Sequence, residues 1–71
     1  MVEQERVLTG GDVRAERNRH QPIVTQGELA DELGWYRQAI TPIENGDVEA
    51  SQAQLREMLD AVARVVARRH V

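Results

Sequence analysis

The last third of the chain carries the feature that most constrains its fold. Ser51 and Gln54 have the spacing of a capping box, in which each side chain bonds the backbone N–H of the other residue at the start of a helix. After them, apolar side chains recur at steps of three and four residues, the period of one helix face: Leu55, Met58, Leu59, Val62, Val65 and Val66. The pattern predicts one long helix from Gln52 to Arg69.

The chain is short, which limits how much of the apolar face of this helix a single copy can bury. Its 71 residues, 41% of them apolar and 30% charged, are typical of a single small globular domain. Such a domain buries only about 60% of the surface that its unfolded chain exposes, so help from a partner chain is expected. We expect Val62, Val65 and Val66 to extend past the core and to form the contact of a homodimer, which makes residues 61–71 a candidate dimerisation extension.

Two shorter helices are predicted before the long one, on either side of Gly34. Thr25 and Glu28 form a second capping box and start a helix that Gly34 stops, because glycine readily adopts the left-handed conformation of a helix end. Ile40 and Ile43 mark the buried face of the next helix, which runs roughly from Tyr36 to Glu44.

The stretch "ITPIENG", residues 40–46, can be interpreted as a helix start or a helix end. Thr41 and Glu44 have capping-box spacing, but Asn45-Gly46 is a stop signal directly after them. A helix of one turn is too costly to nucleate, so the stretch is predicted to be an end. Pro42 then lies inside the helix, where it removes a backbone hydrogen bond at a cost of roughly 3 kcal/mol, and a bend is expected there.

The N-terminal part is predicted to be an arm followed by a short helix. Residues 1–11 show little periodicity, and we interpret them as the arm of a domain that covers residues 12–71. Asp12 can cap a helix from Val13 to about His20, which must end before Pro22. No stretch alternates with period two for long enough to predict a strand, so the expected class is all-α.

Composition excludes several kinds of function. Without cysteine there is no disulfide framework and no thiolate metal site, and two histidines are too few for a metal centre, so we expect no metal or cofactor. No nucleophile is paired with a base, which argues against an enzyme. No apolar run approaches the roughly 20 residues that span a bilayer, so we expect a cytoplasmic protein without membrane attachment.

Charge is distributed unevenly. The net charge is −3, and all nine basic residues are arginine. Two segments are nevertheless basic, and each carries three arginines: Arg14, Arg17 and Arg19 in the first, and Arg64, Arg68 and Arg69 in the second. For the C-terminal segment, a solvated helix end that favours cations and a surface for a polyanion remain equally open interpretations.

Two short helices joined at a glycine turn are the arrangement of a DNA-binding helix-turn-helix. The segment "TQGELADELGWYRQAITPIENGD", residues 25–47, resembles the phage repressor and Cro-type (XRE-like) family, whose usual form is T-Q-x-x-L-A-x-x-x-G-x-x-x-x-x-I-x-x-I-E-x-G. The resemblance covers about a third of the chain without a gap. It implies a lambda-repressor-like bundle of four to five helices, in which the second helix of the pair lies in the DNA major groove and a dimer reads two half-sites.

The resemblance also implies roles for single residues. Arg37, Gln38 and Thr41 would face base edges, and Gln26, Tyr36 and Asn45 would contact the DNA backbone. Glu44 would pair with an arginine of the first helix and hold the recognition helix in place. Two arginines are candidates for that pair: Arg14, which we prefer because "VRAERN" resembles the family's first helix, and Arg19, which gap-free spacing selects.

We therefore expect a sequence-specific regulator that binds a double-stranded DNA operator, such as a repressor, a Cro-like switch or an antitoxin-like autoregulator. Its expected partners are a second copy of the chain and, beyond DNA, RNA polymerase or a toxin. The alternative is a protein-interaction module that keeps the helix-turn-helix fold but does not bind DNA. The acidic net charge and Pro42 are compatible with this alternative.

Overall fold

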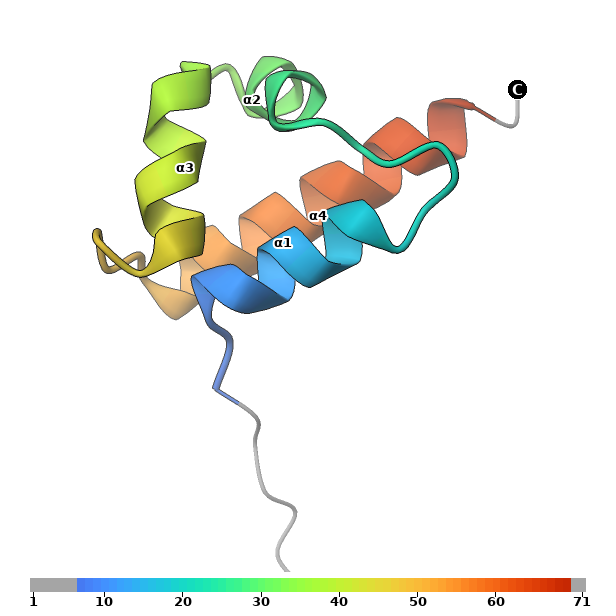
Figure 1. Ribbon diagram of the computed structural model, residues 1–71. Coiled ribbons are helices and arrows are strands. Elements are labelled where there is room, and N and C mark those ends of the chain that lie inside the picture. The colour runs from blue at the N-terminus through green and yellow to red at the C-terminus, as the bar shows by residue number, and fades with distance from the viewer. Residues whose placement is uncertain (1–6, 70–71) are drawn as a thin grey trace, which may run out of the picture.

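The computed structural model describes residues 7–69, and within them the chain forms four α-helices and no strand (Figure 1). These helices are α1 (Gly10–Asn18), α2 (Gln26–Leu33), α3 (Arg37–Asn45) and α4 (Gln52–Arg68). The predicted all-α class is confirmed. The long C-terminal helix is confirmed too, and α4 continues without the break that would create a fifth helix in this range.

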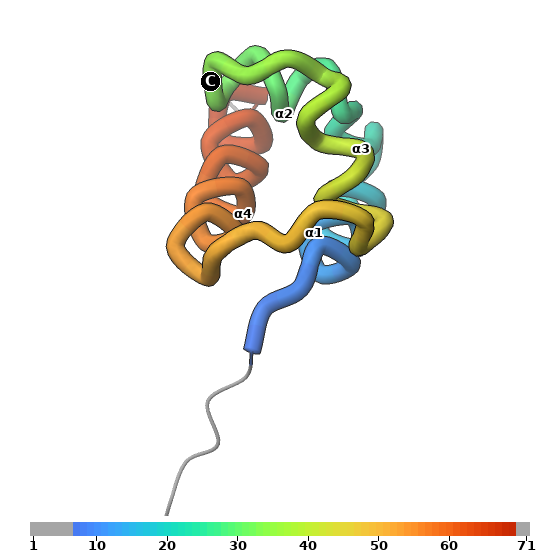
Figure 2. The backbone as a smooth tube through the Cα atoms, turned by 90° about the vertical axis from the view of Figure 1, so that its left-hand side faces the viewer, coloured from blue at the N-terminus to red at the C-terminus, as the bar shows by residue number. Residues whose placement is uncertain are grey.

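The four helices enclose the core as a ring, in which each helix packs against two others. Both α1 and α2 contact α3 and α4, whereas α3 and α4 do not pack against each other (Figure 2). The largest of the fully buried side chains come from all four helices and from the loop before α2: Val13, Val24, Leu29, Ile40, Met58 and Val62. The ring leaves α3 with one face on the core and one face outward.

Capping boxes start three of the helices. Two of them, Thr25 with Glu28 and Ser51 with Gln54, are the predicted ones. The third was not predicted: Thr9 caps α1, and Asp12 is its reciprocal partner at the third helical position. The first helix therefore begins at Gly10, three residues earlier than predicted and inside the expected arm, because Asp12 closes the box and does not serve as the N-cap.

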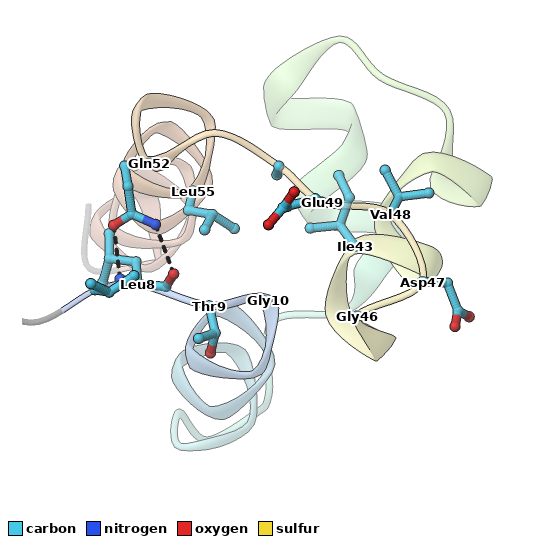
Figure 3. Close-up of a pocket in the computed structure, with 12 residues that line it drawn as sticks. Leu8, Thr9, Gly10, Ile43, Gly46, Asp47, Val48, Glu49, Gln52 and Leu55 are labelled. Atoms are coloured by element: carbon cyan, nitrogen blue, oxygen red, sulfur yellow. Dashed lines mark hydrogen bonds between the residues drawn. The ribbon is translucent and has the colours of Figure 1, made fainter.

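The end of the predicted arm is fixed to the body of the protein. The side-chain amide of Gln52 accepts a hydrogen bond from the Leu8 N–H and donates one to the Leu8 carbonyl, both at 2.8 Å (Figure 3). Leu8 and Gln52 line one side of a groove of about 540 Å³, and Ile43 and Leu55 also line it. The first six residues of the expected arm lie outside the described range.

The C-terminal valines correct the proposed dimer contact. Val62 and Val65 are 0% and 5% exposed within the single chain, and Val66 is partly buried against the same core. The prediction that they extend past the core was wrong because α4 packs along its length against both α1 and α2. Val62 and Val65 therefore belong to the core of the single chain, and Val66 packs partly against it.

The "ITPIENG" stretch ends α3, as predicted. Gly46 adopts the left-handed conformation with φ of 84°, and its N–H bonds the carbonyls of the last turn. The N–H groups of Asp47 and Val48 also bond the Pro42 carbonyl, at 2.8 and 3.1 Å. The helix runs past Pro42 to Asn45 without interruption. Among the helices described, none is long and apolar enough to cross a membrane.

Candidate nucleic-acid interface

The turn between α2 and α3 is held by backbone geometry. Gly34 ends α2 in the left-handed region with φ of 73°, as the sequence predicted, and the Trp35 N–H donates to the Ala30 carbonyl at 2.9 Å. The Trp35 side chain is partly buried against the core. Tyr36 is the N-cap of α3, and its side chain makes no capping bond and is 84% exposed. The two helices thus form a helix-turn-helix arrangement with an exposed phenol at the start of the second helix.

The outward face of α3 carries the side chains that the sequence assigned to base contacts. Arg37, Gln38 and Thr41 are all exposed, as is Asn45 at the end of the helix. Within residues 7–69, neither the guanidinium of Arg37 nor the carboxamide of Gln38 has a hydrogen-bond or ion-pair partner. Two polar groups with strong directional hydrogen-bonding capacity therefore stand free on the same helix.

A buried ion pair fixes α3 against α1. The guanidinium of Arg17 donates from Nε and Nη2 to the two carboxylate oxygens of Glu44, both at 2.7 Å, and from Nη1 to the Val24 carbonyl at 2.9 Å. Arg17 and Glu44 are only 6% and 5% exposed. This two-pronged arrangement is the strongest form of an arginine–carboxylate contact, and it restricts both translation and rotation of the helix.

Neither arginine that the sequence offered for this pair is the partner. Val13 and Arg17 lie one turn apart on the buried face of α1, whereas Arg14 lies at the edge of that face, on the side of α3, and is exposed. Arg19 is the C-cap of α1 and pairs with Glu16 at 2.8 Å on the surface. The sequence signal for Arg17 was its spacing of four residues from the apolar Val13, and both residues lie within the predicted helix.

Gln26 connects the ion pair to the outward face of α3. Its Nε2 donates to a Glu44 carboxylate oxygen at 3.2 Å, and its Oε1 accepts a hydrogen bond from the Thr41 hydroxyl at 3.0 Å. The sequence assigned Gln26 to a phosphate and Thr41 to a base, as separate contacts. In the structure the two side chains contact each other, so a ligand that engages one of them also acts on the other.

The C-terminal arginines are bound to acidic and carbonyl groups of the same chain. Arg64 and Arg68 both pair with Glu32 of α2, at 2.8 and 2.6 Å, and Arg69 donates to the Ile23 carbonyl at 3.0 Å. The hydrogen bonds from Arg64 and Arg68 lower the pKa of Glu32 below its ordinary value. Of the two interpretations of this basic segment, the structure favours a helix surface that joins α4 to α2.

No cluster of histidine, cysteine or acidic side chains that could hold a metal ion occurs between residues 7 and 69. Comparison of the chain with models of protein families, with curated proteins and with solved structures found no match.

Proposed function

We propose that this protein is a sequence-specific double-stranded DNA-binding regulator whose α3 reads base edges in the major groove. The observation that carries the proposal is the combination of free and fixed groups on α3. Arg37 and Gln38 face outward without partners in the described range, while the Arg17–Glu44 pair holds the helix that carries them. A rigid helix with free side-chain tips loses little conformational entropy when those tips bind.

The chemistry of the free groups matches base edges. The forked guanidinium of Arg37 suits the O6 and N7 acceptors of guanine, and the carboxamide of Gln38 suits N6 and N7 of adenine. Each two-pronged contact contributes about 1–3 kcal/mol of discrimination. Thr41 lies beside them, oriented by Gln26. The resemblance of residues 25–47 to the phage repressor and Cro-type family, lambda repressor among them, supports the same orientation of α3.

Backbone contacts would position the helix. Gln26 is the first residue of α2, where free N–H groups and the helix dipole attract a phosphate. Tyr36 and Asn45, at the two ends of α3, are exposed and within reach of the flanking strands of DNA. Because Gln26 also orients Thr41, its replacement by alanine is expected to weaken binding to all sequences and to loosen selectivity at the Thr41 position.

Regulation would follow from occupation of an operator, which blocks RNA polymerase or brings the protein into contact with it. A homodimer that reads two half-sites belongs to the proposal, with a contact that does not use Val62 or Val65, since both are buried in the monomer. The net charge of −3 makes nonspecific attachment to DNA weaker than binding to an operator, so nonspecific binding is expected at low salt and selectivity comes from α3.

Fluorescence anisotropy with a labelled duplex of mixed sequence, measured at several salt concentrations, tests the proposal. A DNA-binding protein should bind the duplex with an affinity that falls as salt rises, because bound cations are released from the phosphates. The alternative, an interaction module that does not bind DNA, predicts no binding to any duplex, even at a low salt concentration of about 50 mM.

A further inference from the structure

The arginines of the described range fall into two groups. Five of them are paired with a carboxylate of the same chain: Arg17, Arg19, Arg64, Arg68 and Arg69. Three have no such partner between residues 7 and 69: Arg14, Arg37 and Arg56. Arg37 belongs to the candidate base-reading face. Arg14 has no assigned role once Arg17 is known to be the partner of Glu44.

Arg14 lies on the side of α1 that faces α3. Gly10, Arg14 and Arg17 are spaced by four and three residues and therefore share one helix face. The first of them touches the last turn of α3, because a Cβ at Gly10 would overlap the Ile43 carbonyl, and the last of them binds Glu44. Arg14 lies between these two residues along α1 and is exposed to solvent. Figure 1 shows that the start of α1 lies beside the C-terminal end of α3.

Within residues 7–69, no acceptor group binds the Arg14 guanidinium. Glu16 lies on a different side of α1 and is held by Arg19 at 2.8 Å and His20 at 3.2 Å. The Pro42 and Ile43 carbonyls at the end of α3 already accept hydrogen bonds from backbone N–H groups of the following loop. A long cation is thus left beside the base-reading helix with its five N–H donors available to an anion from outside.

We propose that Arg14 binds a backbone phosphate of the DNA strand that flanks the groove occupied by α3. This inference rests on the proposed function. A side chain on α1 is set back from the tips of α3, so it reaches the rim of the groove, where phosphates lie, and not the base edges. Arg14 would then add a backbone contact from α1 to those proposed for Gln26 on α2 and for the two ends of α3, which fixes the angle of α3 in the groove.

The salt dependence of duplex binding tests this contact. Arg14→Gln is compared with Arg56→Gln, which removes the same charge from α4, a helix that does not pack against α3. Both residues are exposed and unpaired in the described range, so urea unfolding should show wild-type stability for both variants. In anisotropy titrations with a B-form duplex of mixed sequence, Arg14→Gln should reduce the slope of log affinity against log salt by about 0.9, the value for one lost phosphate contact. Arg56→Gln should leave the slope unchanged.

The outcomes separate the two proposals. Equal slopes for wild type, Arg14→Gln and Arg56→Gln would overturn the Arg14 contact and leave DNA binding in place. An equal reduction of the slope in both variants would also overturn the Arg14 contact, because the net charge of the protein and not the position of Arg14 would then explain the effect. Absence of duplex binding by the wild-type protein would overturn the proposed function and the inference with it.

Discussion

Arg17 and Glu44 are 27 residues apart in the sequence and meet in a buried, two-pronged ion pair with both distances at 2.7 Å. Through Gln26, which donates to the same carboxylate, the pair joins α1, α2 and α3 at one point. The position of the outward face of α3 therefore depends on an interaction at its inward face. If α3 reads DNA as proposed, this single carboxylate couples stability to recognition.

Removal of one member of this pair should strongly destabilise the fold. Glu44→Leu leaves the Arg17 guanidinium buried without its anion, and such losses cost about 3–5 kcal/mol. The double variant Arg17→Met/Glu44→Leu should recover most of that loss, because an apolar pair needs no charge compensation. Urea unfolding followed by circular dichroism measures both. Arg14→Ala is the matched control on α1 and should change the free energy of unfolding by less than about 0.5 kcal/mol. A larger loss for Arg14→Ala than for Glu44→Leu would contradict the assignment of the pair.

The two adjacent glycines of α1 should respond in opposite directions to alanine. A Cβ at Gly10 would overlap the Ile43 carbonyl, so Gly10→Ala must push α1 away from α3 and is expected to cost about 1–3 kcal/mol. At Gly11 the nearest atom to an added Cβ is the Thr9 hydroxyl oxygen, at an ordinary 3.5 Å, and Gly11→Ala should stabilise the helix by about 0.4–1 kcal/mol. Thermal unfolding of the two variants is a direct comparison. Similar shifts for both would show that α1 and α3 do not approach closely at Gly10.

Local signals in the sequence predicted much of this fold. The capping boxes at Thr25 and Ser51 and the glycine end of α3 depend on residues three or four positions apart, and the structure has all of them. The partner of Glu44 could not be predicted in the same way. It depends on which side of α1 faces inward, and that side is set by the packing of α1 against α3 and α4, which involves residues far apart in the sequence.

The burial of the C-terminal valines also could not be predicted from local sequence patterns. The period of the apolar stripe is the same whether its far end covers the protein's own core or a second chain. Which of these occurs depends on how far α2 and α1 reach along α4. The outward residues of α3 were assigned from the family resemblance, and their exposure agrees with the helix period that buries Ile40 and Ile43.

The corrected position of Val62 has a measurable consequence. Val62→Ala removes two methyl groups from a completely buried site and should cost about 2–3 kcal/mol in transfer energy and cavity formation. Because this loss falls on the monomer, the change in unfolding free energy should be the same at all protein concentrations. If the destabilisation appeared only at concentrations where a dimer forms, Val62 would belong to a subunit interface after all.

The protein should become less stable in acid, because protonation of carboxylates breaks their bonds to arginine side chains and to helix N-termini. The pKa of Glu32 is lowered by hydrogen bonds from Arg64 and Arg68, and the pKa of Glu28 is lowered mainly by its bond from the Thr25 N–H. A lowered folded-state pKa adds stability above the ordinary value of 4.5, and this stability disappears as the pH falls through the folded-state pKa. Glu32→Gln should therefore lower stability at pH 7 and flatten the decline below pH 4.5. The difference between Glu32→Gln and wild type at pH 7 should shrink in 1 M salt, because these ion pairs are screened there. An unchanged acid limb in Glu32→Gln would refute this role.

Selection of bound sequences from a pool of random duplexes, run in parallel with wild-type protein and Arg37→Ala, tests the central claim most directly. The account predicts that the wild type recovers a near-palindrome with half-sites about one helical turn apart, and that Arg37→Ala recovers the same sequence with its preference for guanine relaxed at one position of each half-site. Recovery of no common sequence by the wild type, or of an identical sequence by Arg37→Ala, would contradict the claim that the outward face of α3 reads DNA.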